Sequence, residues 1–181
     1  ADPRLDAYTR QNYLDNVLRG GIPELKPSKS GPTLLHIYSR RHGDAERDYN
    51  FFDLPAHPLS SGEGNYRDIC QNRRCDIWFY PEIWDREIKM FVNLLQADGE
   101  NPLSIKGYKW CLSEEVDPMQ WCQMANAKAQ KAFKKLTSRW FLPGEIVAWS
   151  DFYNVEMSDR DKWLDSILSE CQVKLIASGH E

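Results

Sequence analysis

The chain has 181 residues, of which 41% are hydrophobic and 12% aromatic, and its formal net charge is −4. This composition excludes an intrinsically disordered chain, and the length is typical of one folded domain or at most two. The acidic balance gives no basic field to attract nucleic acid or an anionic membrane surface, so we expect neither as a partner.

The first predicted element is a helix over residues 5–18, where apolar residues recur at near-helical spacing before a pair of glycines ends it. Residues 24–33 are predicted to be an internal linker, because proline, serine and lysine dominate this stretch. A short β-prone run follows at residues 33–38. The prolines, serines and glycine of residues 53–63 predict a long loop.

Three helices are predicted in the second half of the chain, over residues 85–99, 117–136 and 158–171. Each begins near a residue that can cap a helix, and each carries an apolar stripe at helical spacing. The aromatic-rich stretch at residues 140–153 is predicted to be non-helical. The residues expected to face inward are Ile88, Phe91, Val92 and Leu95 in the first helix, Cys122, Ala125, Ala129, Ala132, Phe133 and Leu136 in the second, and Trp163, Leu164, Ile167, Leu168 and Cys171 in the third.

The five cysteines, at positions 70, 75, 111, 122 and 171, form no Cys-x-x-Cys pair, and any complete disulfide scheme leaves one of them unpaired. This pattern favours a reducing compartment, and we expect a cytoplasmic protein. The spacing of the cysteines and the four histidines does not match a zinc site. We therefore expect buried thiols and no metal.

Two polar clusters form the candidate ligand site. Residues 64–74 place Arg, Asp, Gln and Asn between a glycine and the apolar run at residues 77–80, and residues 42–52 combine His, Asp, Arg and Asn before two phenylalanines. Guanidinium, carboxylate and amide groups together supply the donors and acceptors that bind the vicinal hydroxyls of a sugar. We therefore expect an oligosaccharide ligand in one cleft shared by both clusters. The candidate side chains are His42, Asp44, Arg67, Asp68 and Gln71.

Two aromatic residues further along, Trp149 and Tyr153, are additional candidates. Aromatic rings stack on the apolar faces of pyranoses, so Trp149 could form part of a sugar platform. The same residues could instead close one end of a helical core, because Trp and Tyr also suit half-buried positions. Both interpretations remain open at the level of the sequence.

The motifs of this region resemble those of a known family. They comprise His42-Gly43-Asp44, the Arg-Asp-Tyr-Asn-Phe run at residues 47–51, Gly64-Asn65-Tyr66-Arg67-Asp68 followed by Gln71, and the helix end at residues 88–99. Over residues 34–100 the chain is similar to cellobiose-phosphorylase-like proteins and to their relatives among the α/α-toroid glycosidases and cyclic glucan synthases.

This resemblance implies a mainly α fold made of the helical hairpins of a six-hairpin toroid. It also implies a glycoside phosphorylase-like or inverting glycosidase-like enzyme that acts on a β-glucan or oligosaccharide. Arg67 and Asp68 would hold the sugar beside the scissile bond, and Gln71 would support them. Phosphorolysis would use inorganic phosphate as co-substrate and no other cofactor, whereas an inverting hydrolase needs a second carboxylate to activate water.

Two features depart from the family pattern. The general acid of the family lies in a Trp-Asn-Asp context, and Trp149-Ser150-Asp151 lacks the Asn, so the catalytic residue is unknown. A closed toroid also needs roughly twice this length. We therefore expect residues 1–181 to form one domain that is part of a larger catalytic domain, inactive alone, with the remainder of its polypeptide or another chain as partner. The alternatives are a non-catalytic carbohydrate-binding domain and a helical protein-interaction domain.

Overall fold

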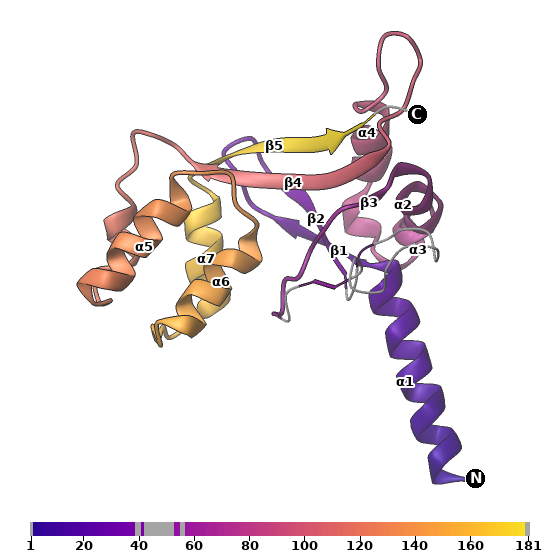
Figure 1. Ribbon diagram of the computed structural model, residues 1–181, viewed down its shortest axis with the longest axis horizontal. Helices are drawn as coiled ribbons and strands as arrows, with labels where there is room; N and C mark the ends of the chain where they lie inside the picture. Colours follow the sequence, from indigo (N-terminus) through magenta and orange to yellow (C-terminus); the bar gives the residue numbers. More distant parts are fainter. Residues whose placement is uncertain (1, 39–40, 42–52, 55–56, 180–181) are drawn as a thin grey trace.

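The computed structural model describes residues 2–38, 41, 53–54 and 57–179. It is a mixed α/β structure with a two-stranded and a three-stranded antiparallel sheet, and helices gather at both ends of the strands (Figure 1). The expected mainly α, toroid-like fold is therefore wrong. The finding that overturns it is a long β-ladder between residues 104–112 and 171–178, where no strand was predicted. Among the residues described, no helix is both long and apolar enough to cross a membrane.

The first helix is α1 (Pro3–Gly20), which confirms the helix predicted in this part of the chain. It is followed by Gly21, whose φ of 90° lies in the left-handed region that glycine adopts readily. The strands β1 (Ile22–Lys26) and β2 (Thr33–Ile37) then form an antiparallel hairpin. Residues 24–33, which were predicted to be a linker, form the end of β1, the turn and the start of β2.

The second sheet consists of β3 (Gly64–Asn65), β4 (Ser104–Leu112) and β5 (Cys171–Ser178), with β4 in the middle. A β-bulge after Ile105 shifts the register of β4 against β5. As a result Ile105 and Trp110 are both buried although they are an odd number of residues apart. The bulge breaks the alternation by which a strand is identified in a sequence, and this explains why β4 was not predicted.

One group of short helices lies at the end of the sheet that contains β3 (Figure 1). It consists of α2 (Tyr66–Arg73), α3 (Asp76–Phe79), the 3₁₀-helix η2 (Pro81–Ile83) and α4 (Arg86–Val92). Ile69 of α2, Met90 and Phe91 of α4, and Ile105 of β4 form a small core beneath it.

Helix α4 ends earlier than the helix predicted at residues 85–99, and it buries a different face. Of the residues expected to point inward, Phe91 is buried, whereas Ile88, Val92 and Leu95 are exposed. The predicted stripe is therefore wrong at these three positions. Helical spacing identified a face of α4 that is apolar but that the described part of the chain does not cover.

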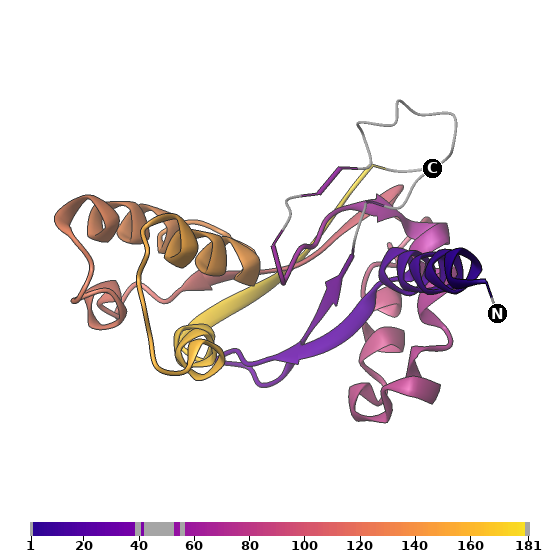
Figure 2. The same ribbon diagram turned by 90° about the horizontal axis from the view of Figure 1, so that it is seen from below.

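The second group of helices lies at the opposite end of the strands, as Figure 2 shows. It consists of the 3₁₀-helix η3 (Pro118–Trp121), α5 (Ala127–Thr137), α6 (Pro143–Phe152) and α7 (Arg160–Leu168). These helices pack with one end of the β4–β5 ladder around the larger core. Its fully buried side chains include Trp110, Phe133, Phe141, Ile146 and Leu164.

The helix starts in this second group differ in part from prediction. The helix predicted from Asp117 is interrupted, because Asp117 caps η3 and a second cap, Asn126, starts α5. The third predicted helix is confirmed as α7, which Asp159 caps by accepting the Lys162 N–H. The prediction that residues 140–153 are non-helical is wrong. Pro143 stands in the first turn of α6, and the Glu145 carboxylate accepts the backbone N–H of Leu142, the residue before the helix. These two features start the helix in spite of its aromatic composition.

Candidate functional site

Helix α2 carries three of the side chains predicted to bind a sugar. Arg67 and Gln71, four residues apart, are exposed, and Asp68 is half-buried beside Arg67. Arg67 Nε lies 3.5 Å from Asp68 Oδ1, a long contact that stabilises the helix little. The two other members of the predicted cleft, His42 and Asp44, lie outside the described residues. The cleft shared by both polar clusters therefore stays a prediction.

Trp149 lies in the larger core rather than on a surface. Its side chain is 6% exposed, its Nε1–H donates to the carbonyl of Ala129 at 3.1 Å, and its ring packs against Phe133 and Trp163. Trp149 is therefore a core residue, which is the second of the two interpretations left open by the sequence, and its ring offers no face to a sugar. Asp151, in the motif compared with the general acid of the family, forms an exposed ion pair with Arg160 at 2.7 Å.

Three aromatic side chains that follow α2 in the sequence are strongly exposed, and we call them the aromatic surface. They are Trp78 and Phe79 of α3 and Trp84 at the end of η2, which are 81%, 78% and 74% exposed. Large aromatic side chains are usually buried, and exposed ones that gather in one region mark a binding surface. Two residues, Arg74 and Cys75, separate α3 from the polar helix α2. The sequence signal for Trp78 and Phe79 was the apolar run at residues 77–80, to which no role of its own was assigned, and no signal pointed to Trp84.

The backbone of Trp84 is strained. Its φ of 51° and ψ of −123° lie in a region that residues with a side chain rarely adopt. Such a conformation costs on the order of 1–3 kcal/mol and is concentrated at functional sites, where the surrounding structure imposes it. At Trp84 the strained backbone coincides with a side chain that the described residues leave exposed.

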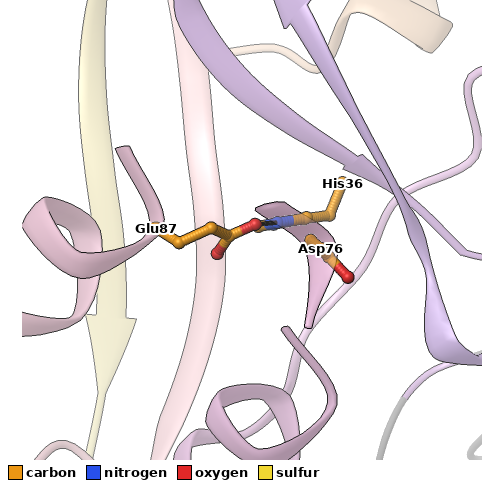
Figure 3. Close-up of side chains that lie close together, drawn as sticks. All are labelled: His36, Asp76 and Glu87. Atoms are coloured by element: carbon orange, nitrogen blue, oxygen red, sulfur yellow. Dashed lines mark hydrogen bonds and ion pairs between the residues drawn. The ribbon is translucent and has the colours of Figure 1, made fainter. Parts of the chain in front are cut away.

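A buried polar cluster lies beneath this region, between β2 and the helices α2 to α4. We use this name for His36, Tyr38, Arg73, Asp76 and Glu87. The His36 Nε2–H donates to Glu87 Oε1 at 2.7 Å, and Figure 3 shows the Glu87 carboxylate reaching the imidazole ring, with Asp76 next to it. Arg73 lies over the ring of Tyr38 and forms an ion pair with Asp76, with 3.2 Å between Nε and Oδ2.

The cluster carries two carboxyl groups against one permanent cation. Burial raises the pKa of Asp76 to about 7, in spite of the opposing effect of the Arg73 guanidinium, and the negative charge of Glu87 raises the pKa further. Burial also raises the pKa of the Tyr38 hydroxyl well above its usual range. The cluster can therefore hold one added positive charge, either a proton or a cation.

Close packing fixes the position of the cluster. A Cβ atom added at Gly21 would overlap the Tyr38 ring and the Arg73 guanidinium, so the turn after α1 touches the cluster directly. Sequence reasoning missed these residues, because His36, Asp76 and Glu87 lie on three separate elements and their spacing follows no metal-binding or catalytic motif.

The comparisons with known proteins add no relative. No family model, no curated protein and no solved structure matches the chain. The resemblance to cellobiose-phosphorylase-like proteins therefore stays a prediction from the motifs.

Proposed function

We propose that the chain is a carbohydrate-binding domain that takes an oligosaccharide on the aromatic surface next to α2. The observation that carries the proposal is Trp84, an exposed indole held by a strained backbone beside the exposed Trp78 and Phe79. Indole and phenyl rings present flat apolar faces, and the axial C–H groups of a pyranose pack against such faces. A strained and exposed aromatic residue is more readily explained by a ligand than by folding.

The polar side chains of α2 supply the second half of the chemistry. Asp68 can accept hydrogen bonds from two vicinal hydroxyls, Arg67 can donate to a hydroxyl or ring oxygen, and Gln71 can do both. Helix α2 leads into the aromatic surface through two residues, so one oligosaccharide chain can reach both. The proposal gives the chain a binding role, whether alone or as part of a larger carbohydrate-active protein. It assigns no general acid.

Calorimetric titration with β-glucan oligosaccharides tests this proposal. Trp78→Ala should weaken binding at least about fivefold, because a well-placed aromatic contact is worth about 1 kcal/mol or more. Phe152→Ala is the matched control, since Phe152 is also 74% exposed but belongs to the helical group at the other end of the strands. Equal affinities for wild type and Trp78→Ala, or no saturable binding of any oligosaccharide, would contradict the proposal.

A protein-binding surface is the second candidate, and a separate observation favours it. Ile88 and Val92, four residues apart on α4, are exposed on one side of the helix, and Leu95, just beyond the end of the helix, is exposed as well. Aliphatic side chains of this kind suit a protein interface better than a sugar. If Ile88→Ser abolishes self-association or partner binding while oligosaccharides fail to bind wild type, the protein-interaction function replaces the first.

A further inference from the structure

Three potential metal ligands meet inside the buried polar cluster. His36 comes from β2, Asp76 from the first turn of α3, and Glu87 from the first turn of α4. One nitrogen or oxygen atom from each of the three lies within 4.8 Å of the other two. All three residues are more than nine-tenths buried. In Figure 3 the Glu87 carboxylate and the His36 ring meet from opposite sides, and Asp76 lies beside them.

Several polar atoms at this point lack hydrogen bonds. Within the described part of the chain, Glu87 Oε2, Asp76 Oδ2 and Arg73 Nη1 are buried and have no hydrogen-bond partner. The Arg73–Asp76 pair is close, but its N–H is not aligned with the carboxylate oxygen. Buried carboxylate oxygens are nearly always satisfied. Asp76 and Glu87 are close enough to hydrogen-bond each other once one of them is protonated, so a proton, an ion or a water must satisfy these oxygens. This observation is independent of the residue types that form the cluster.

We propose that His36, Asp76 and Glu87 bind a divalent transition-metal ion, with Zn²⁺ the best chemical match. One imidazole nitrogen with two carboxylate oxygens is a nitrogen and oxygen set that zinc accepts, whereas calcium and magnesium prefer oxygen alone. Two ligand atoms of a tetrahedral zinc ion, each at about 2.1 Å from the ion, lie about 3.4 Å apart. Side-chain movements of about 1 Å would bring three atoms that lie within 4.8 Å of one another to this spacing.

Arg73 fits the surroundings of such an ion. A carboxylate that ligates a metal is usually held by a second group outside the ligand shell, and the guanidinium of Arg73 lies in that position beside Asp76. Zinc would replace the Nε2 proton that His36 gives to Glu87. The competing occupant is a single proton shared by the carboxyl groups of Asp76 and Glu87. With this proton, the remaining carboxylate balances the Arg73 cation and the cluster has no net charge. The two occupants differ in their response to added metal.

The ion would connect the β1–β2 hairpin to α3 and α4, which are distant in sequence. Binding to the folded state alone should raise the melting temperature as the metal concentration increases. Three protein ligands leave one position of a four-coordinate zinc ion to a water, and the burial of all three ligands keeps that position away from bulk solvent, so we expect the ion to stabilise the fold.

The test uses full-length protein stripped of metal with a chelator and titrated with Zn²⁺ and Co²⁺. We expect one equivalent to bind and to raise the melting temperature. The bound Co²⁺ should show the visible absorption of nitrogen and oxygen ligands without the intense near-ultraviolet band of cysteine thiolate ligands. Glu87→Gln should weaken binding at least tenfold, and Glu115→Gln, at an exposed glutamate paired with Lys29, should leave it unchanged.

Three outcomes would overturn the proposal. These are the absence of saturable binding by wild type, a thiolate band in the cobalt spectrum, and equal affinity in wild type and Glu87→Gln. If Glu87→Gln does not fold, the decision rests on the stoichiometry and cobalt spectrum of wild type, which need no variant.

Discussion

Replacement of Trp84 provides a direct test of backbone strain at the aromatic surface. At ordinary positions a variant with glycine has a free energy of unfolding about 0.5–1 kcal/mol lower than the variant with alanine, because glycine leaves the unfolded chain more conformational freedom. At Trp84 the left-handed φ of 51° reverses this order, since alanine keeps the strain and glycine removes it. With mid-range values of about 2 kcal/mol for the strain and about 0.75 kcal/mol for the glycine cost, Trp84→Gly should be more stable than Trp84→Ala by about 1 kcal/mol.

The comparison of these two variants cancels the loss of the indole, which both lack. Urea unfolding of wild type, Trp84→Ala and Trp84→Gly, with equal m-values as the condition for comparison, gives the difference directly. Oligosaccharide affinity should fall equally in both variants, because the proposed sugar contact is the ring. If Trp84→Ala proves as stable as Trp84→Gly or more so, the backbone is not strained and the main support for the proposed function is lost.

Three further predictions follow from the same region and from the larger core. Asp68→Asn removes a charged acceptor and should weaken oligosaccharide binding by about 1.5–3 kcal/mol in a calorimetric titration, and unchanged affinity would remove Asp68 from the site. In chelator-containing buffer, Arg73→Met should destabilise the fold by about 3–5 kcal/mol, because it leaves the buried carboxyl groups of Asp76 and Glu87 without their cation, and adding Asp76→Leu should recover part of this loss by removing one of the two carboxyl groups; a double variant no more stable than Arg73→Met in urea unfolding would contradict this. Burial raises the pKa of the Cys171 thiol to about 12. At pH 8 iodoacetamide should therefore label the exposed Cys75 first and Cys171 only on unfolding. Mass spectrometry measures both labelling rates, and similar rates in the folded protein would refute the burial of Cys171.

Local sequence signals predicted those elements whose start and end depend on neighbouring residues. The helix before Gly21, the β-prone run of β2 and the helix capped by Asp159 all formed as expected. In each case a glycine, a cap or a run of β-branched and apolar residues acts within a few positions in the chain. The side chains of Arg67 and Gln71 are exposed, but no helix was predicted at residues 66–73 or 76–79, where α2 and α3 lie.

Packing between distant segments decided the rest. The β4–β5 ladder joins residues about sixty positions apart through a bulge that disrupts the strand pattern, and the fold class was therefore missed. Helical spacing showed that α4 has an apolar face with Ile88, but which face is covered depends on Ile69 of α2 and Ile105 of β4.

The sequence by itself determined that the chain folds, where several of its helices begin, and that a polar cluster precedes a run of aromatic residues. Tertiary structure alone decided that Trp149 is a core residue and that Trp84 is exposed on a strained turn. It also brought His36, Asp76 and Glu87 together from three elements. The physical reason is that burial and ligand geometry are properties of non-local contacts, and residue spacing along one element carries no information about the element that will pack against it.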